Sequence, residues 1–306
     1  IDLDVRGVEA YAQILIQVNK KKLALELIED ELSKSFNPHF PLIDLKNKIQ
    51  EDLLIEYDFI TNPKQGIAEV YLTIAKLLKN KIEHNQVLLL SRIAEYLRPE
   101  YPTIVFQVAN VLENLQQYDL ALDSYSSVNP KNPNYLLAEL GRAKNLALLN
   151  RESESIEVLK SLSKSHYDNV VVHSSLGNML RETDRDIEAL EAYSTAINLA
   201  NLRNQPRWPI YFYRGILYEK QKNFVKMESD FREALKISPN QPDVLNFLGY
   251  ALVEQRKKLP EALQMIKMAV SEKPKSGYII DSLGWVFYRL SKYELAIEPM
   301  ERAVEL

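Results

Sequence analysis

The side chains best suited to acid–base or metal chemistry in this chain are its four histidines. A zinc site or a proton-transfer pair needs histidines and carboxylates that converge on one point. Only two of the histidines stand near each other, and their spacing is loose. We interpret the second of these, His173, as a side chain packed between helices. The four residues are His39, His84, His166 and His173. Their spacing predicts no metal site and no catalytic base.

Motifs of enzymes are absent from the sequence. There is no phosphate-binding loop, dinucleotide fingerprint, nucleophile elbow or HExxH zinc motif. The chain has no cysteine, which excludes disulfides, thiol catalysis and zinc–thiolate sites. Its carboxylates follow the spacing of exposed helix faces, as in Glu152, Glu154 and Glu157. We therefore predict that the chain is not an enzyme and that it holds no cofactor and no metal.

The charge of the chain points away from nucleic acid and from anionic membranes as partners. The formal net charge is −4, and the cluster Lys20-Lys21-Lys22 stands alone at an expected turn. No stretch approaches the ~20 apolar residues of a membrane span. The sequence begins at Ile1 rather than at methionine. We therefore expect that an N-terminal segment was removed, to which a signal peptide or lipid anchor could have belonged.

The elements that must position any site are indicated by a glycine that recurs every 34–38 residues. It lies in a pattern of large-x2-Leu-Gly-x2-large, then Ala-x3-large-x2-Ala, then proline. Each copy holds two apolar stripes of helical spacing, which predicts a pair of amphipathic helices that approach closely at their small residues. The clearest copies run over 245–274 and 280–303. The recurring glycines are Gly141, Gly177, Gly215, Gly249 and Gly284.

This pattern resembles the tetratricopeptide repeat (TPR) family. The resemblance implies an all-α fold, a right-handed superhelical solenoid of antiparallel helix pairs. It covers residues 66–306, where we predict one continuous array of about seven repeats. Residues 1–65 match poorly and are predicted to hold degenerate helical repeats, with a helix pair over about 8–32 and a single helix over about 41–57.

One copy is four residues longer than its neighbours, between Ala196 and Gly215. Four residues are close to one helical turn. Pro206 and Pro209 prevent a helix from crossing this point. We predict that a longer second helix and a longer loop share the extra residues.

The resemblance also implies a groove lined by the first helix of each pair. Counted from the Leu-Gly pair, its lining positions hold aromatic, amide and charged residues that could anchor a peptide. They include Phe106, Asn110, Arg142, Asn178, Asn246, Tyr250, Asp281, Trp285, Tyr288 and Arg289. A competing interpretation is that Trp285 and Tyr250 pack against a further repeat. The basic clamp by which some TPR domains bind chaperone tails is incomplete, so we do not predict that ligand.

We interpret the chain as a non-enzymatic adaptor or scaffold that binds a protein or peptide in this groove. Segments such as Asp281-Ser-Leu-Gly-Trp285 are similar to long TPR proteins of the Gram-negative cell envelope, some of them lipoproteins that act as protease adaptors. This implies a periplasmic or outer-membrane-associated protein, with a protease as a candidate partner. Three alternatives stay open: a cytoplasmic location, an accessory region of an enzyme whose catalytic domain lies elsewhere, and a scaffold that binds another copy of itself.

Overall fold

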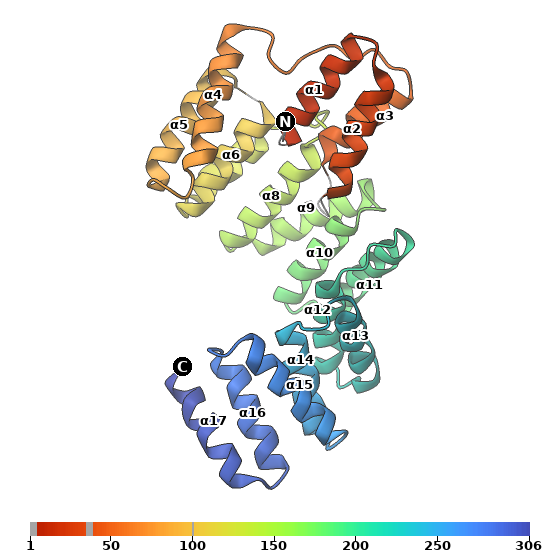
Figure 1. The fold of residues 1–306 in the computed structure, drawn as a ribbon, viewed down its shortest axis with the longest axis vertical. Coiled ribbons are helices and arrows are strands. Elements are labelled where there is room, and N and C mark those ends of the chain that lie inside the picture. Colours follow the sequence, from red (N-terminus) through yellow and green to blue (C-terminus); the bar gives the residue numbers. More distant parts are fainter. Residues whose placement is uncertain (1–4, 35–38, 100) are drawn as a thin grey trace. The chain divides into compact units, whose positions relative to one another are not determined.

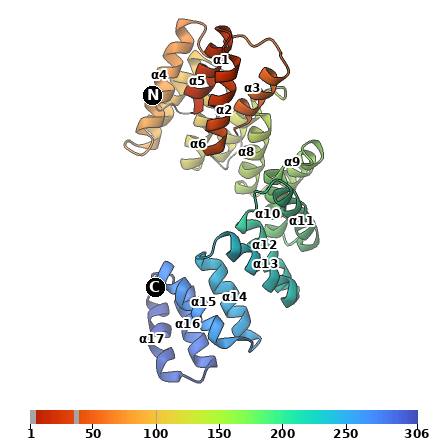
Figure 2. The same ribbon diagram turned by 45° about the vertical axis from the view of Figure 1, so that its right-hand side comes forward.

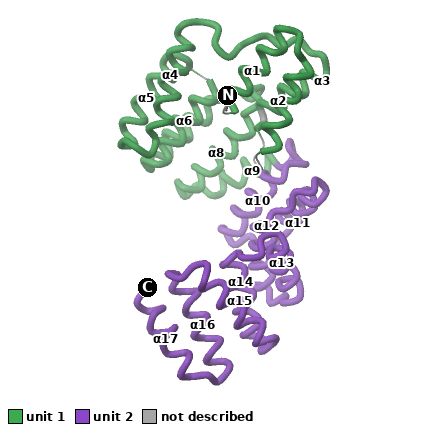
Figure 3. The backbone as a smooth tube through the Cα atoms, viewed as in Figure 1, with its two compact units in different colours: residues 1–162 green, residues 163–306 purple. Residues whose placement is uncertain are grey.

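The computed structural model describes residues 5–34, 39–99 and 101–306. The chain forms two compact units, residues 1–162 and 163–306 (Figure 3). Every regular element in the described ranges is an α-helix, and most helices pack against the next one as antiparallel pairs, such as α4 with α5 and α16 with α17 (Figures 1 and 2). The all-α fold of helix pairs is thereby confirmed. The predicted division of the chain after residue 65 stays a prediction.

The first unit contains a helix pair, a single helix and further pairs. α1 packs on α2, α4 on α5, and α6 on α7. The helices are α1 (Val5–Gln17), α2 (Lys21–Lys34), α3 (Phe40–Gln50), α4 (Pro63–Leu78), α5 (His84–Leu97), α6 (Pro102–Asn114), α7 (Tyr118–Ser126), α8 (Tyr135–Leu148) and α9 (Glu152–Ser165), in which the unit boundary falls.

The second unit contains four consecutive pairs. Each first helix packs on its own second helix, and α14 also packs on α16, the first helix of the next pair. The helices are α10 (Val170–Glu182), α11 (Asp186–Leu202), α12 (Trp208–Lys220), α13 (Phe224–Ile237), α14 (Pro242–Glu254), α15 (Leu259–Glu272), α16 (Gly277–Arg289) and α17 (Tyr293–Glu305).

The sharp turns inside the pairs come from residues in the left-handed conformation. Lys222 and Arg256 have φ of 56° and 54°. The next amide closes the helix end in each case: the Asn223 N–H donates to the carbonyl of Tyr218 at 2.8 Å. This geometry satisfies carbonyl groups that the last helical turn leaves without a partner. A left-handed residue therefore ends the first helix and allows the second to return at once.

The same geometry corrects one sequence expectation. The single helix predicted over 41–57 begins at Phe40 but ends at Gln50. Asp52 is left-handed, with φ of 56°, and the Leu53 N–H donates to the carbonyl of Lys48 at 3.0 Å, which ends the helix. The residues from 53 to 62 form a connection without helix.

The extra residues between the copies at Ala196 and Gly215 lie where we expected them. α11 has 17 residues, whereas α13 and α15 have 14 each. A turn over residues 203–207 then precedes α12. The prediction that a longer helix and a longer loop share these residues is confirmed.

The recurring glycines let bulky side chains approach the first helix of a pair. A Cβ atom added at Gly177 would lie 2.7 Å from the ring of Tyr193 on α11. The glycine of α8 differs, since a Cβ atom at Gly141 would lie 2.6 Å from Tyr125, which belongs to the preceding helix α7. The close neighbour of Gly141 therefore comes from the previous pair rather than from the following helix α9. Here a residue of the previous pair fills the space.

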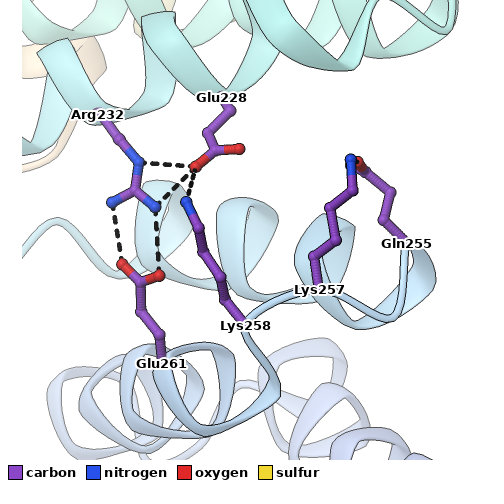
Figure 4. A network of polar contacts seen from close by, with 6 residues as sticks. All are labelled: Glu228, Arg232, Gln255, Lys257, Lys258 and Glu261. Atoms are coloured by element: carbon purple, nitrogen blue, oxygen red, sulfur yellow. Dashed lines mark hydrogen bonds and ion pairs between the residues drawn. The ribbon is translucent and has the colours of Figure 1, made fainter.

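A polar network joins α13 to the start of α15 (Figure 4). The guanidinium of Arg232 contacts the carboxylates of both Glu228 and Glu261, with its closest oxygens at 2.8 and 3.0 Å. Lys258, the left-handed residue before α15, places its Nζ 2.8 Å from Glu228. All four side chains are partly exposed, so the network orients the turn more than it stabilises the fold.

Candidate functional site

The predicted groove residues of the first unit are held by interactions within the fold. The Phe106 ring lies 5.8 Å from that of Tyr125. Asn110 accepts a hydrogen bond from Lys79 at 2.6 Å. Arg142 forms two hydrogen bonds with Glu139, each 2.9 Å long, and this carboxylate raises the pKa of the guanidinium. The structure brings these three residues into no common cluster.

Asn178 in the second unit is also held within the fold. Its side-chain oxygen accepts a hydrogen bond from the hydroxyl of Tyr193 at 2.7 Å. It lines a small cavity of about 140 Å³ together with Ser174 and Tyr213. The hydrogen bond joins α10 to α11, so this amide supports the helix pair.

The other six predicted residues lie on α14 and α16. The Trp285 indole N–H on α16 donates to the Glu254 carboxylate on α14 at 2.6 Å. Arg289 donates to the same oxygen at 3.1 Å. The rings of Trp285 and Tyr288 stack with centroids 5.4 Å apart and planes 19° apart. The name α14–α16 face is used below for Asn246, Tyr250, Glu254, Asp281, Trp285, Tyr288 and Arg289.

The α14–α16 face combines exposed aromatic rings with a buried amide. Tyr250 is 42% exposed and Tyr288 is 48% exposed, although both are large side chains. Asn246 is only 5% exposed, and its Oδ1 atom has no hydrogen-bond donor within the described part of the chain. Burial raises the pKa of the Tyr250 phenol, and the charges of Glu254 and Asp281 raise it further. This arrangement can accept hydrogen bonds and cover apolar surface, and whether it binds a ligand stays a prediction.

A tetratricopeptide repeat model matches residues 209–241, which contain α13 and all of α12 except its first residue. Over 202 residues the chain is 26% identical to a TPR repeat-containing protein of Pseudomonas aeruginosa, a match that covers 65% of this chain and 33% of the relative. The chain is a tetratricopeptide repeat protein. It is also 26% identical over 171 residues to human tetratricopeptide repeat protein 13, covering 54% of this chain and 19% of that protein.

This TPR chain thus spans a third or less of the length of these relatives. Among solved structures, that of MamA protein matches with a TM-score of 0.50 and 14% identity, over 57% of this chain and 92% of MamA. That likeness supports the fold. Among the described residues, no helix is long and apolar enough to cross a membrane, and no group of histidines and carboxylates could hold a metal ion.

Glu254, which the counting from the Leu-Gly pair also places on the groove side, and Tyr293, which it does not, extend the set of aromatic and charged residues at the α14–α16 face. Glu254 lies one turn after Tyr250 and links α14 to α16 through Trp285 and Arg289. Tyr293, at the start of α17, places its ring 5.5 Å from that of Tyr288. Glu254 lies six residues after Leu248, at a position that the counting predicts to face the groove. Tyr293 belongs to a second helix, so the counting from the Leu-Gly pair does not reach it.

A second concave feature of the TPR chain lies in the first unit, a cavity of about 740 Å³ beside α1 and α3. The connection over residues 53–62 forms one wall. The Arg98 guanidinium holds this connection by donating to the Phe59 carbonyl at 2.6 Å and to the Asp58 carbonyl at 3.1 Å. Glu9 lines the cavity, and burial, reinforced by the Asp58 charge, raises its pKa to about 6.

We expect Glu9→Gln to stabilise the TPR chain at neutral pH and not at acid pH. The folded-state pKa of about 6 exceeds the ordinary value of 4.5, so the ionised carboxylate disfavours folding. Below pH 4.5 both states bind the proton and the penalty vanishes; above pH 6 it is fully present. The shift corresponds to on the order of 1–2 kcal/mol in the free energy of unfolding. Urea unfolding of both proteins at pH 4 and pH 7.5 measures it.

The matched control is Glu51→Gln, which removes an exposed carboxylate from the same unit. If Glu9→Gln changed the free energy of unfolding equally at both pH values, the burial of this carboxylate would not be the cause.

Proposed function

We propose that this TPR protein is a non-enzymatic adaptor or scaffold that binds an extended segment of a partner protein on the α14–α16 face. The observation that carries the proposal is the group of aromatic rings on this face, in which exposed Tyr250 and Tyr288 lie beside Trp285 and are ordered by stacking and hydrogen bonding. Exposed apolar side chains that cluster, unlike scattered single ones, mark interaction sites.

The order already present in the face supports a role in binding. Glu254 fixes the Trp285 indole and the Arg289 guanidinium, and Tyr288 stacks on the indole. Side chains held in place before binding lose little conformational entropy when a partner arrives. An aromatic anchor then contributes through the apolar area that it buries. The face therefore has the features of a preformed binding surface.

The identity of the partner follows only from the sequence resemblance. Similarity to envelope TPR proteins makes an envelope protease the first partner to test, and the periplasm or outer membrane the first compartment. A second copy of the chain and an associated catalytic domain are the alternatives. Cross-linking in the native cell with wild-type protein, and with the double variant described next, separates these partners by mass.

The test replaces two anchors, in the double variant Tyr250→Ala/Trp285→Ala. Panning a random peptide display library on the wild-type protein supplies ligands, whose affinities are then measured by calorimetry. Because each truncated anchor removes buried contact area, we expect the double variant to bind the selected peptides more than about 10-fold less tightly. In a Trp208→Phe background the fluorescence of Trp285 reports binding directly, since these are the two tryptophans of the chain.

The matched control is Tyr167→Ala, which removes a tyrosine that is 73% exposed in the same unit but lies outside the face. Circular dichroism and thermal melts must show that all variants stay folded. Unchanged peptide affinity in a folded double variant would contradict the proposal. Loss of thermal stability together with binding would favour the interpretation that these rings only hold the last repeats together.

A further inference from the structure

We infer that the segment bound by the α14–α16 face is basic, and that one of its lysine or arginine side chains lies over Tyr250 near the carboxylates of Asp281 and Glu219. The inference rests on the proposed function and adds the chemistry of the partner. Three independent features of the second unit lead to it: unpaired carboxylates, a buried acceptor, and aromatic rings that accept a cation.

The first feature is an excess of unpaired negative charge. Arg289 is the cation of the α14–α16 face, and it is already paired with Glu254 at 3.1 Å. Asp281 on α16 and Glu219 at the end of α12 are exposed, and neither has an ion pair or hydrogen bond within the described residues. Both carboxylates act on the Tyr250 phenol, whose pKa they help to raise. The field beside this ring is therefore negative and attracts a cation.

The second feature is the buried acceptor. Asn246 lies one helical turn before Tyr250 and is only 5% exposed. Its Oδ1 nevertheless accepts no hydrogen bond within the described part of the chain. Buried amide oxygens normally have a donor. Together with the two carboxylates, it makes the unsatisfied groups at this place acceptors. The enclosed oxygen does not contact a ligand directly, but its partial negative charge adds to that of the carboxylates and favours a cationic side chain nearby.

The third feature is the behaviour of the aromatic rings toward a cation. The Arg289 guanidinium lies 5.5 Å from the centre of the Trp285 ring, within the range of a cation–π contact. Tyr288 also stacks on the Trp285 ring, with centroids 5.4 Å apart. Tyr250 and Tyr288 remain exposed and can accept a second cation. An acidic segment would instead meet two unpaired carboxylates with no free cation of this face to compensate them.

The test compares the charge of the peptides selected from a random display library by three proteins: wild type, Asp281→Asn/Glu219→Gln, and Asp281→Lys. Peptides are counted only if they fail to bind Tyr250→Ala/Trp285→Ala. We expect wild type to enrich lysine and arginine. The variant that lacks both carboxylates should bind the selected peptides about 2- to 5-fold less tightly, as expected for exposed ion pairs. Asp281→Lys should weaken them at least about 10-fold and favour acidic peptides.

The control Glu272→Gln removes an exposed carboxylate from α15 of the same unit and should leave both affinity and charge preference unchanged. Binding of the basic peptides should weaken as sodium chloride rises from low to high concentration, because salt screens exposed charges. Enrichment of acidic or uncharged peptides that still depend on Tyr250 and Trp285 would overturn the inference and leave the proposed function standing. Absence of any peptide that depends on these two rings would overturn both.

Discussion

Replacement of Arg214 by methionine should destabilise the second unit by about 3–5 kcal/mol, because it leaves a buried carboxylate without its partner. Arg214 on α12 forms two hydrogen bonds with Asp230 on α13, at 2.7 and 2.8 Å. The side chains are only 17% and 6% exposed. A third contact, from Arg214 to the Ser194 hydroxyl at 3.0 Å, ties in α11. Urea unfolding at neutral pH measures the loss.

Two further variants separate the ion pair from simple loss of packing. Arg214→Met/Asp230→Leu removes both charges, and we expect it to recover most of the lost free energy of unfolding, since no unpaired charge remains buried. Arg214→Lys should recover little, because an ammonium cannot form the paired hydrogen bonds of the guanidinium. Burial already raises the pKa of Asp230 in the wild-type protein. If the double variant were as unstable as Arg214→Met, the charges would not be the cause.

This ion pair also shows what the sequence could not predict. Arg214 stands directly before Gly215, where other copies carry leucine, as at Leu176 and Leu248. The repeat pattern therefore predicts an apolar residue between the helices, and a charged one contradicts it. Its partner Asp230 lies 16 residues later, at a distance that no local spacing rule connects. A charged pair that replaces an apolar contact is visible only once both helices are packed.

The helix pairs themselves could be predicted because their apolar stripes and small residues repeat with a fixed period. The ends of the helices were harder to predict. The left-handed residues that end the first helix of each pair are lysine, arginine, asparagine, aspartate, glutamine and serine rather than glycine. Such residues carry no strong signal for the left-handed conformation that ends a helix. This explains why the helix that ends at Gln50 was predicted to continue to residue 57.

The sequence could predict which residues of the candidate site share a face, because that depends only on their position in the repeat. It could not predict which side chains bond to which partners. Equal positions on α14 and α16 bring Tyr250 and Trp285 onto one face, as the repeat requires. The same counting also selected Asn178 and Asn110, which instead bond to Tyr193 and Lys79. A position in a repeat fixes the face of the helix, while the neighbours decide whether the side chain is free to bind.

The second large effect is expected at Gly215, where added volume should destabilise the fold. A Cβ atom there would lie 2.6 Å from the ring of Phe231, which is fully buried. This ring cannot move aside, because those of Phe212 and Phe247 pack against it at 5.8 and 6.3 Å. We expect Gly215→Ala to lower the free energy of unfolding by about 1–3 kcal/mol, and Gly215→Leu by about 3 kcal/mol or more. Thermal melts measure both.

The matched control is Gly66→Ala on α4, where the nearest atom to the new methyl group would be 3.7 Å away. With room available, alanine in a helix should stabilise by about 0.5–1 kcal/mol, so the two substitutions have opposite signs. Gly284→Ala should also destabilise, because the new methyl group would lie 2.5 Å from Cγ of Met300 and 3.3 Å from the Ala296 carbonyl oxygen. Gly215→Ala/Phe231→Leu should regain part of the loss. If Gly66→Ala and Gly215→Ala changed the free energy of unfolding equally, Gly215 would not be the point at which α12 and α13 approach closely.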